Sequence, residues 1–137
     1  MKEITIFTDG GARGNPGPAG IGAVVYDEKD NEMSTLSEAI GEGTNNVAEY
    51  TAIVRALQHV ATLVDDTKAI KVTLKLDSQL AERQLNGAYK VKDETLKGLY
   101  AEVKELVGEY ASVEFIHVKR ELNKVADKLV NQALDAL

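Results

Sequence analysis

The stretch ITIFTDGGARGNPGPAGIGAVVYDE, from Ile4 to Glu28, decides the fold. Its first part, Ile4–Thr8, and the later run Gly20–Asp27 are rich in β-branched and apolar residues, which predicts two strands. Asp9 stands at the tip of the first strand, before a loop dense in glycine and proline. Because glycine removes side-chain bulk and proline stiffens the backbone, the main chain of this loop could lie against a ligand.

This loop also has simpler interpretations. An aspartate before two glycines occurs in ordinary turns, and a hairpin connection needs glycine anyway. Two phosphate-binding signatures are excluded: no Gly-Lys-Ser/Thr follows, and there is no G-x-G-x-x-G leading into a helix. The loop alone therefore leaves a ligand contact and a structural turn as alternatives.

The rest of the chain alternates between strand and helix periodicity. In chain order, the apolar pattern predicts a paired strand over Met33–Ala39, a helix from Asn46 to Val64, a strand over Ile70–Leu76, helices over Gln79–Gln84 and Glu94–Val107, a strand over Val113–Val118, and a closing helix from Leu122 to Leu137. The order βββαβααβα is typical of an α/β fold with a mixed sheet. We expect one domain spanning residues 1–137.

Composition narrows the classes of function. The chain has no cysteine, which removes disulfides and thiolate metal sites. No apolar run reaches the length of a signal peptide or a membrane span, so we expect a cytoplasmic protein without a membrane partner. The formal net charge of −6 argues mildly against a nucleic-acid partner. Many acids gather on predicted turns such as Asp27–Glu32, so local lysines rather than net charge would decide binding.

Four carboxylates on distant elements could meet at one edge of the sheet. Asp9 and Asp77 each end a predicted strand, and the carboxyl edge of parallel strands is where open α/β sheets hold ligands. Glu49 and Asp127 lie near the margins of the apolar faces of two helices. Taken singly, each acid has an ordinary explanation: a turn for Asp9, a capping box with Asn46 for Glu49, a helix cap for Asp77, and a solvated helix face for Asp127.

Those separate explanations do not account for the set. Like charges packed into one corner repel one another unless a cation intervenes. Carboxylate oxygens are the hard ligands that Mg²⁺ prefers, and paired ions of this kind promote phosphoryl displacement. The pattern therefore favours a metal-dependent site.

Five segments together resemble type 1 ribonuclease H, in the compact form common in archaea and many bacteria. They are TDGGARGNPGPAGIG, TNNVAEYTAIVRAL, LDSQL, QLNGAYKVK and VKRELNKVADKLVNQAL, which occur in order over almost the whole chain. The resemblance implies the ribonuclease H-like fold, a five-stranded mixed sheet flanked by helices. It also implies endonucleolytic hydrolysis of the RNA strand of RNA·DNA hybrids, leaving 5′-phosphate and 3′-hydroxyl ends.

The resemblance assigns the catalytic and metal-binding roles to Asp9, Glu49, Asp77 and Asp127, with two Mg²⁺ ions that Mn²⁺ could replace. Asp9 would bridge both ions, Asp127 would lie beside the ion that activates water, and Glu49 and Asp77 would serve the ion near the leaving 3′-oxygen. It further implies that the hybrid is contacted by Gly10, Gly11, Ala12, Arg13, Asn15, Asn45, Asn46, Gln79 and Lys90, with Lys92 beside it. Without the family, Asn46 could be only a helix cap, Gln79 an ordinary helix residue, and the lysines simply surface.

Two departures from many relatives matter. The flexible loop before the last aspartate carries histidine in many of them, whereas here Arg120 is the expected occupant and His117 falls inside the predicted strand. His59, on the long helix, is expected to be structural. A longer basic protrusion that helps some relatives grip the hybrid is missing, so we expect modest, strongly salt-dependent affinity.

Two other functions remain alternatives: a non-catalytic nucleic-acid-binding module on the same fold, and another nuclease of the same superfamily. The intact quartet of acids argues against the first, and the early-helix glutamate in NNVAEY argues against the second. We expect a monomer. Activity on double-stranded RNA, and any preference for Mn²⁺ over Mg²⁺, are left open.

Overall fold

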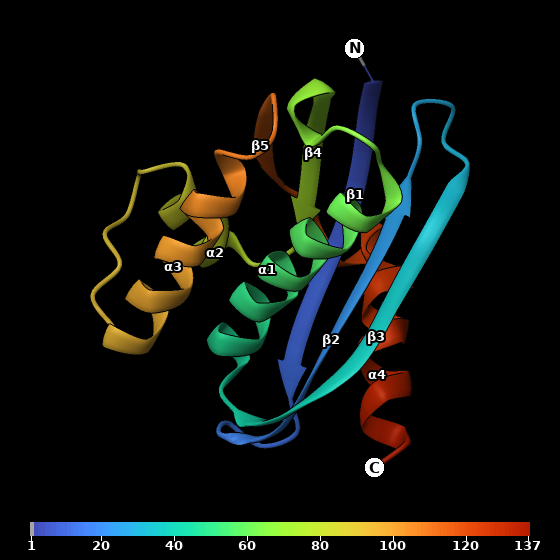
Figure 1. The fold of residues 1–137 in the computed structure, drawn as a ribbon. Coiled ribbons are helices and arrows are strands. Elements are labelled where there is room, and N and C mark those ends of the chain that lie inside the picture. Colours follow the sequence, from blue (N-terminus) through green and yellow to red (C-terminus); the bar gives the residue numbers. More distant parts are fainter. Residues whose placement is uncertain (1) are drawn as a thin grey trace.

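The computed structural model describes residues 2–137, in which five strands form one mixed sheet in the order β3-β2-β1-β4-β5 (Figure 1). Strand β1 is antiparallel to β2 and parallel to β4, while β2 and β3 are antiparallel and β4 and β5 parallel. The α/β fold with a five-stranded mixed sheet is thereby confirmed. The strands are β1 (Lys2–Ala12), β2 (Gly17–Tyr26), β3 (Glu32–Gly43), β4 (Ile70–Leu76) and β5 (Ser112–His117).

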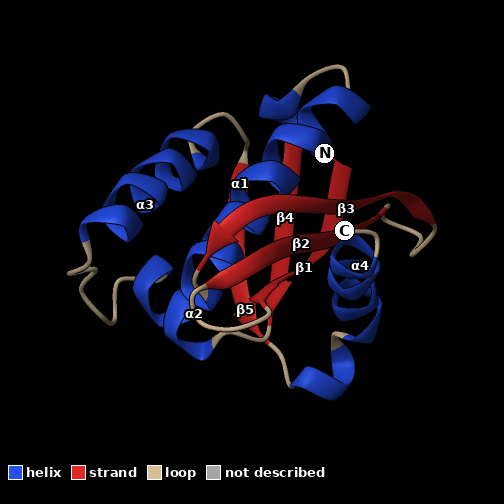
Figure 2. Cartoon of the chain, turned by 90° about the horizontal axis from the view of Figure 1, so that it is seen from below, coloured by secondary structure: helices blue, strands red, loops and turns tan. Residues whose placement is uncertain are grey.

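Helices cover the two faces of the sheet unequally (Figures 1 and 2). Helix α1 (Asn45–Leu63) packs on β1 and β2, and α3 (Glu94–Val107) packs on α1. The short α2 (Gln79–Leu85) contacts β5 and α1 on that side, whereas α4 (Lys124–Asp135) packs on β2, β3 and β1 from the opposite face. No helix in the described residues is long and apolar enough to cross a membrane.

The main core lies between the sheet and α1. Along β1 the side chains alternate, so that Ile4 and Ile6 are buried against the helix, and Leu74 of β4 and Leu57 of α1 are fully buried with them. Strand β2 is buried on both faces, because it lies between α1 and α4. The centre of the sheet is therefore a rigid support for whatever its edge carries.

Strand β1 is longer than predicted: it does not end at Thr8 but continues to Ala12. Residues Asp9–Ala12 keep pairing with Ala19–Gly22 of β2, so Gly10 and Gly11 belong to the sheet rather than to a loop. The predicted connecting loop at Gly41–Thr44 is also wrong in part. Strand β3 extends to Gly43, because its last residues pair with the start of β2.

Helix boundaries differ where local caps decide them. Thr44, not Asn46, caps α1 by accepting a hydrogen bond from Val47 N at 3.2 Å. Ser78, not Asp77, caps α2 by accepting one from Ala81 N at 3.2 Å. The closing helix begins at Lys124 rather than Leu122, because Arg120–Leu122 form a separate 3₁₀ turn, η2. Since neighbouring hydroxyls do the capping, the carboxylates of Glu49 and Asp77 are free for other partners.

Candidate active site

Asp9 and Asp77 lie side by side at the carboxyl edge of two parallel strands. Thr8 of β1 is paired with Leu76, the last residue of β4, so each aspartate is the next residue along its chain. The two side chains belong to adjacent central strands, as the sequence pattern predicted. Strand β1 continues past this point while β4 stops, which opens the edge beside Asp77.

Gly10 allows α1 to bring Glu49 to Asp9. A Cβ atom at Gly10 would lie 2.3 Å from the backbone carbon and oxygen of Ala48 and 2.6 Å from Glu49 N. Any side chain there would push the helix away from the strand. The first turns of α1 therefore rest directly on the β1 backbone, and Glu49 is buried beside Asp9.

Gly22 does the same for α4 on the other face of the sheet. A Cβ atom at Gly22 would lie 2.3 Å from the carbonyl oxygen of Ala126 and 2.9 Å from Val130 N. Asp127 follows Ala126 in the helix, so this close contact also sets the position of the fourth acid. Two glycines, one beside Asp9 in sequence and one opposite it in the sheet, thus admit the two helices that carry the remaining carboxylates.

Three of the four predicted acids form a tight cluster. Asp9, Glu49 and Asp77 each place one carboxylate oxygen within 4.8 Å of the others. Asp9 and Glu49 are only 7% and 8% exposed, and Asp77 is half-buried. The fourth acid, Asp127, is outside this tight group but lines the same groove as Asp9 and Glu49, whose volume is about 370 Å³.

The electrostatics of the cluster are unfavourable without a cation. Burial, and then the negative charge of Asp77, raise the pKa of Asp9 from 3.8 to about 7, and the charge of Asp127 adds to the effect. Burial and the charge of Asp9 raise the pKa of Glu49 well above its usual value. The contact between the two carboxyl groups lowers the pKa of Asp9 and raises that of Glu49. Ionising Asp9 and Glu49 together is therefore unfavourable in the folded protein.

The donor set fits a divalent cation. Oε2 of Glu49 is buried without a hydrogen-bond partner, although buried carboxylate oxygens are normally satisfied. Three converging carboxylates with an unused oxygen are the hard, charged ligand set that Mg²⁺ and Mn²⁺ select. A bound cation would also offset the repulsion that raises both pKa values.

Most of the residues expected to contact the hybrid line the groove around the acids. These are Gly10, Gly11, Ala12, Arg13, Asn45 and Asn46, and Arg120 lines it as well. Asn15, Gln79 and Lys90 are exposed and do not line it. The sequence prediction missed three polar residues here: Ser78 and Asn131, which line the groove, and Asn123, which lies beneath the acids. Neither Ser78 nor Asn131 has a sequence signal beyond its spacing from Asp77 or Asp127.

Two of the predicted contact residues also hold the rim of the groove together. Oδ1 of Asn45 accepts a hydrogen bond from Ala12 N at 2.9 Å, and Asn45 N donates to Oδ1 of Asn15 at 3.0 Å. These bonds join the end of β1 and its loop to the start of α1. Arg13 forms an exposed ion pair with Asp135 at 2.5 Å, which links the same loop to the end of α4.

The two histidines lie away from the groove. His117 is the exposed last residue of β5 and, unlike Arg120, does not line the groove. His59 shares a 2.7 Å hydrogen bond between its Nε2 and Ser34 Oγ, which joins α1 to β3. Of Arg120 and His117, only Arg120 therefore lines the groove of the acids.

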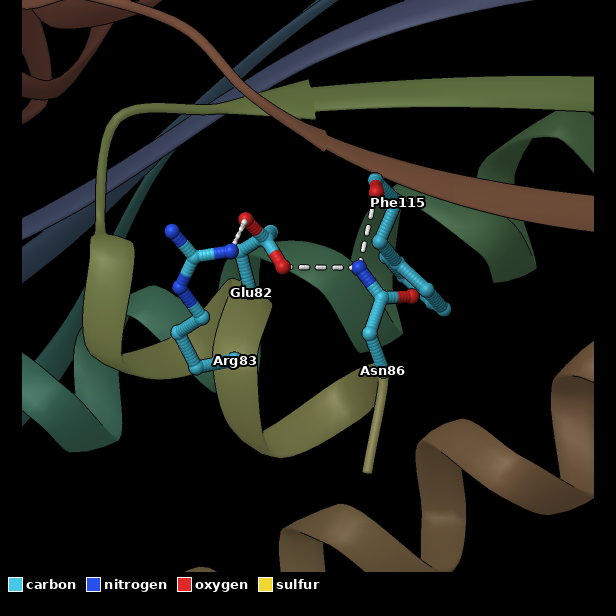
Figure 3. Close-up of polar contacts among 4 residues, drawn as sticks. All are labelled: Glu82, Arg83, Asn86 and Phe115. Carbon is cyan, nitrogen blue, oxygen red and sulfur yellow. Dashed lines mark hydrogen bonds and ion pairs between the residues drawn. The ribbon is translucent and has the colours of Figure 1, made fainter. Parts of the chain in front are cut away.

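Helix α2, which follows Asp77 almost directly, is anchored at both sides. The Tyr50 hydroxyl donates to Oε1 of Gln84 at 2.7 Å, which ties α2 to the helix that carries Glu49. On the other side, Nδ2 of Asn86 donates to Oε2 of Glu82 at 2.7 Å and to the carbonyl of Phe115 in β5 at 3.0 Å (Figure 3). Helix α2 is thus joined to α1 on one side and to β5 on the other.

Comparison with known proteins agrees with this fold. A family model described as reverse transcriptase-like matches residues 7–133. The structure of LC11-RNase H1, isolated from compost by a metagenomic approach, is 49% identical with a TM-score of 0.93 and covers 99% of this chain and 98% of that one. A ribonuclease H of Moorella thermoacetica is 35% identical over 149 residues, 100% of this chain and 95% of that protein. The chain belongs to the type 1 ribonuclease H family.

A second structure of LC11-RNase H1 and one further relative add detail. A crystal structure of LC11-RNase H1 in complex with an RNA/DNA hybrid is 48% identical, with a TM-score of 0.93 over 97% of both chains. A bifunctional protein of Mycobacterium tuberculosis is 38% identical over 98% of this chain, but the match covers only 36% of that protein. The chain therefore spans about a third of the length of this relative.

Proposed function

We propose that this protein is an endoribonuclease that hydrolyses the RNA strand of RNA·DNA hybrids and leaves 5′-phosphate and 3′-hydroxyl ends. The observation that carries the proposal is the cluster of Asp9, Glu49 and Asp77, of which Asp9 and Glu49 line a groove that Asp127 also lines. Membership of the ribonuclease H family, and the hybrid bound by a relative of 48% identity, support the same substrate.

The four acids are the proposed ligands of two divalent cations, with Mg²⁺ as the natural ion and Mn²⁺ as a substitute. Bound cations at such a site lower the pKa of a water molecule and offset the charge that develops on the phosphate. The chain supplies the rest. Burial of Asp9 and Glu49 keeps these two carboxylates out of bulk water. The close contacts of α1 with Gly10 and of α4 with Gly22 position Glu49 and Asp127 before substrate arrives.

The groove offers a way to distinguish RNA from DNA. Gly10, Gly11 and Ala12 bring β1 into the groove with little side-chain bulk, so a sugar-phosphate backbone can approach the main chain. Asn46, Ser78 and Asn131 add small polar groups that are able to hydrogen-bond a 2′-hydroxyl, the group that marks RNA. Arg120 supplies positive charge for a phosphate. All acids of the site come from one chain, and we propose that the protein acts as a monomer in the cytoplasm.

A cleavage assay tests the proposal. A labelled RNA is annealed to DNA, annealed to RNA, or left single-stranded, and is incubated with Mg²⁺, Mn²⁺ or EDTA. We expect metal-dependent internal cuts in the hybrid, and none with Asp127→Asn. The matched control Asp65→Asn, an exposed residue outside the groove, should cut like the wild type.

Three other results of the cleavage assay would change the proposal. Cuts in the RNA duplex as well would show that the groove discriminates loosely between duplexes. Retardation of the hybrid on a native gel without cleavage under any metal condition would contradict the proposed activity and favour a binding module. Equal loss of activity in Asp127→Asn and Asp65→Asn would show that the loss does not come from the site.

A further inference from the structure

Asn123 contacts the elements of three of the four acids at once. It joins η2 to α4 and is only 1% exposed. Its Nδ2 donates to the carbonyl of Thr8, the residue before Asp9, at 2.9 Å and to Oδ2 of Asp77 at 3.4 Å. Its own carbonyl accepts from Asp127 N at 3.1 Å.

Asn123 stands at the N-cap position of α4, but its side chain does not cap the helix. It occupies the N-cap of α4, where asparagine is favoured because its Oδ1 can accept from a free N–H of the first helical turn. Here the side chain makes no cap hydrogen bond, and its buried Oδ1 has no partner. Its Nδ2 is turned toward β1 and Asp77 instead. Helix α4 therefore has no side-chain cap, and Asp77 has a hydrogen-bond donor.

We propose that Asn123 is a positioning residue that holds the Asp77 carboxylate, the strand of Asp9 and the start of α4 in a geometry ready for a divalent cation. The chemistry of the amide suits this task. A neutral donor can bind a carbonyl and a carboxylate oxygen together, whereas a lysine would compete with the cation and an aspartate would repel Asp77. This inference rests on the proposed metal-dependent function.

The chain contains a matched control for this residue. Asn86 uses the same amide nitrogen in the same way, donating to a backbone carbonyl (Phe115) and a carboxylate (Glu82), as Figure 3 shows. Neither Asn86 nor Glu82 lines the groove of the acids. If Asn123 only stabilised the fold, Asn123→Ala and Asn86→Ala should have the same consequences.

The experiment measures metal affinity without substrate. Binding of Mn²⁺ and Mg²⁺ is followed by calorimetry at pH 8 for the wild type, Asn123→Ala, Asn123→Asp and Asn86→Ala, with the melting temperature of each in EDTA. We expect about 10-fold weaker binding, or more, in both Asn123 variants, the loss typical when a hydrogen-bond partner of a metal ligand is removed. Asn86→Ala should bind like the wild type while losing thermal stability.

The possible results distinguish a failure of the positioning role of Asn123 from a failure of the proposed metal-dependent function. Wild-type metal affinity in Asn123→Ala, or an equal loss in Asn86→Ala, would overturn the positioning role and leave the nuclease proposal untouched. A wild type that binds neither ion would overturn the metal site itself. If Asn123→Ala does not fold, Asn123→Asp decides the question, because it keeps the shape of the side chain and removes the donor.

Discussion

Asp9 of β1 lies opposite Gly22 of β2, and the missing side chain of that glycine lets α4 reach the sheet beside the aspartate. The two residues act together: Asp9 is a proposed metal ligand, and Gly22 makes room for the helix that carries Asp127. Gly10 plays the matching part for α1 and Glu49 on the other face.

Gly22→Ala should disturb the site from a distance. The added methyl would meet the Ala126 carbonyl at 2.3 Å, so α4 must shift. We expect a loss of stability of about 1–3 kcal/mol, typical of overpacking, together with weaker metal binding and slower cleavage. Denaturant unfolding and the hybrid assay measure both effects.

Gly98→Ala is the control for that variant. Gly98 lies in α3 with nothing within 4 Å of an added Cβ, so alanine should stabilise the helix by up to about 1 kcal/mol and leave cleavage unchanged. Similar behaviour of the two variants would mean that the close approach of α4 does not matter to the site.

Asp9→Asn should abolish cleavage but stabilise the metal-free protein. Because the folded pKa of Asp9 is raised from 3.8 to about 7, the folded state binds more protons than the unfolded state between these values. Stability in EDTA therefore falls as the pH rises through this window. The variant removes that decline, worth a few kcal/mol at about 1.4 kcal/mol for each pKa unit. Melting temperatures in EDTA from pH 4.5 to 8 test this.

Asp27→Asn should change stability in the opposite direction from Asp9→Asn. Main-chain hydrogen bonds from Asn31 and then Lys29 lower the pKa of Asp27, so its contribution is present above the unfolded pKa and is lost as the pH falls through the folded value. Its replacement should lower stability at neutral pH.

The outcome that would contradict the raised pKa of Asp9 is a plot of stability against pH for Asp9→Asn that follows the plot for the wild type.

Cation binding should release protons near neutral pH. At pH 6, below the raised pKa of about 7 for Asp9, the cluster still holds a proton that a cation must displace, and the raised pKa of Glu49 acts in the same direction. We expect affinity for Mg²⁺ or Mn²⁺ to rise with pH through about 7. Calorimetry in buffers of different ionisation enthalpy counts the protons released. A heat of binding that is independent of the buffer at pH 6 would refute this expectation.

Arg120→Ala should weaken hybrid binding through one phosphate contact. Affinity measured in EDTA should fall for every sequence tested, and the slope of log affinity against log salt should become shallower by about 1. Lys97→Ala is the control, because Lys97 is an exposed cation on α3 outside the groove. Equal slopes for both variants would remove Arg120 from the interface.

The sequence was sufficient to predict the strands and the convergence of the acids. The β-rich run Ile4–Thr8 and the alternating run Ile70–Leu76 predicted that Asp9 and Asp77 each follow a strand. The parallel pairing of β1 with β4 brings the two acids together, although β1 itself continues to Ala12. What it could not show was the length of β1: glycines weaken a strand in isolation, and Gly10 and Gly11 remain in the sheet only because β2 pairs with them.

The helix starts and the role of Asn123 were beyond prediction for another reason. Thr44 and Ser78 compete with their polar neighbours for the same cap, and the winner depends on backbone angles that no spacing reveals. An asparagine before a helix predicts a cap, and only the nearness of Thr8, which is 115 positions away in sequence, gives it a different partner.

The bond between Asn123 and Thr8 determines when the site can be completed during synthesis of the chain. On the ribosome, Asp9, Glu49 and Asp77 are all translated before Asn123 and Asp127. A nascent chain can pair its first strands and still lack both the fourth acid and the amide that steadies Asp77. A chain broken off before the N-cap of α4 should therefore lack Asp127 and Asn123 even where Asp9, Glu49 and Asp77 are present, and we expect such a fragment to show no cleavage.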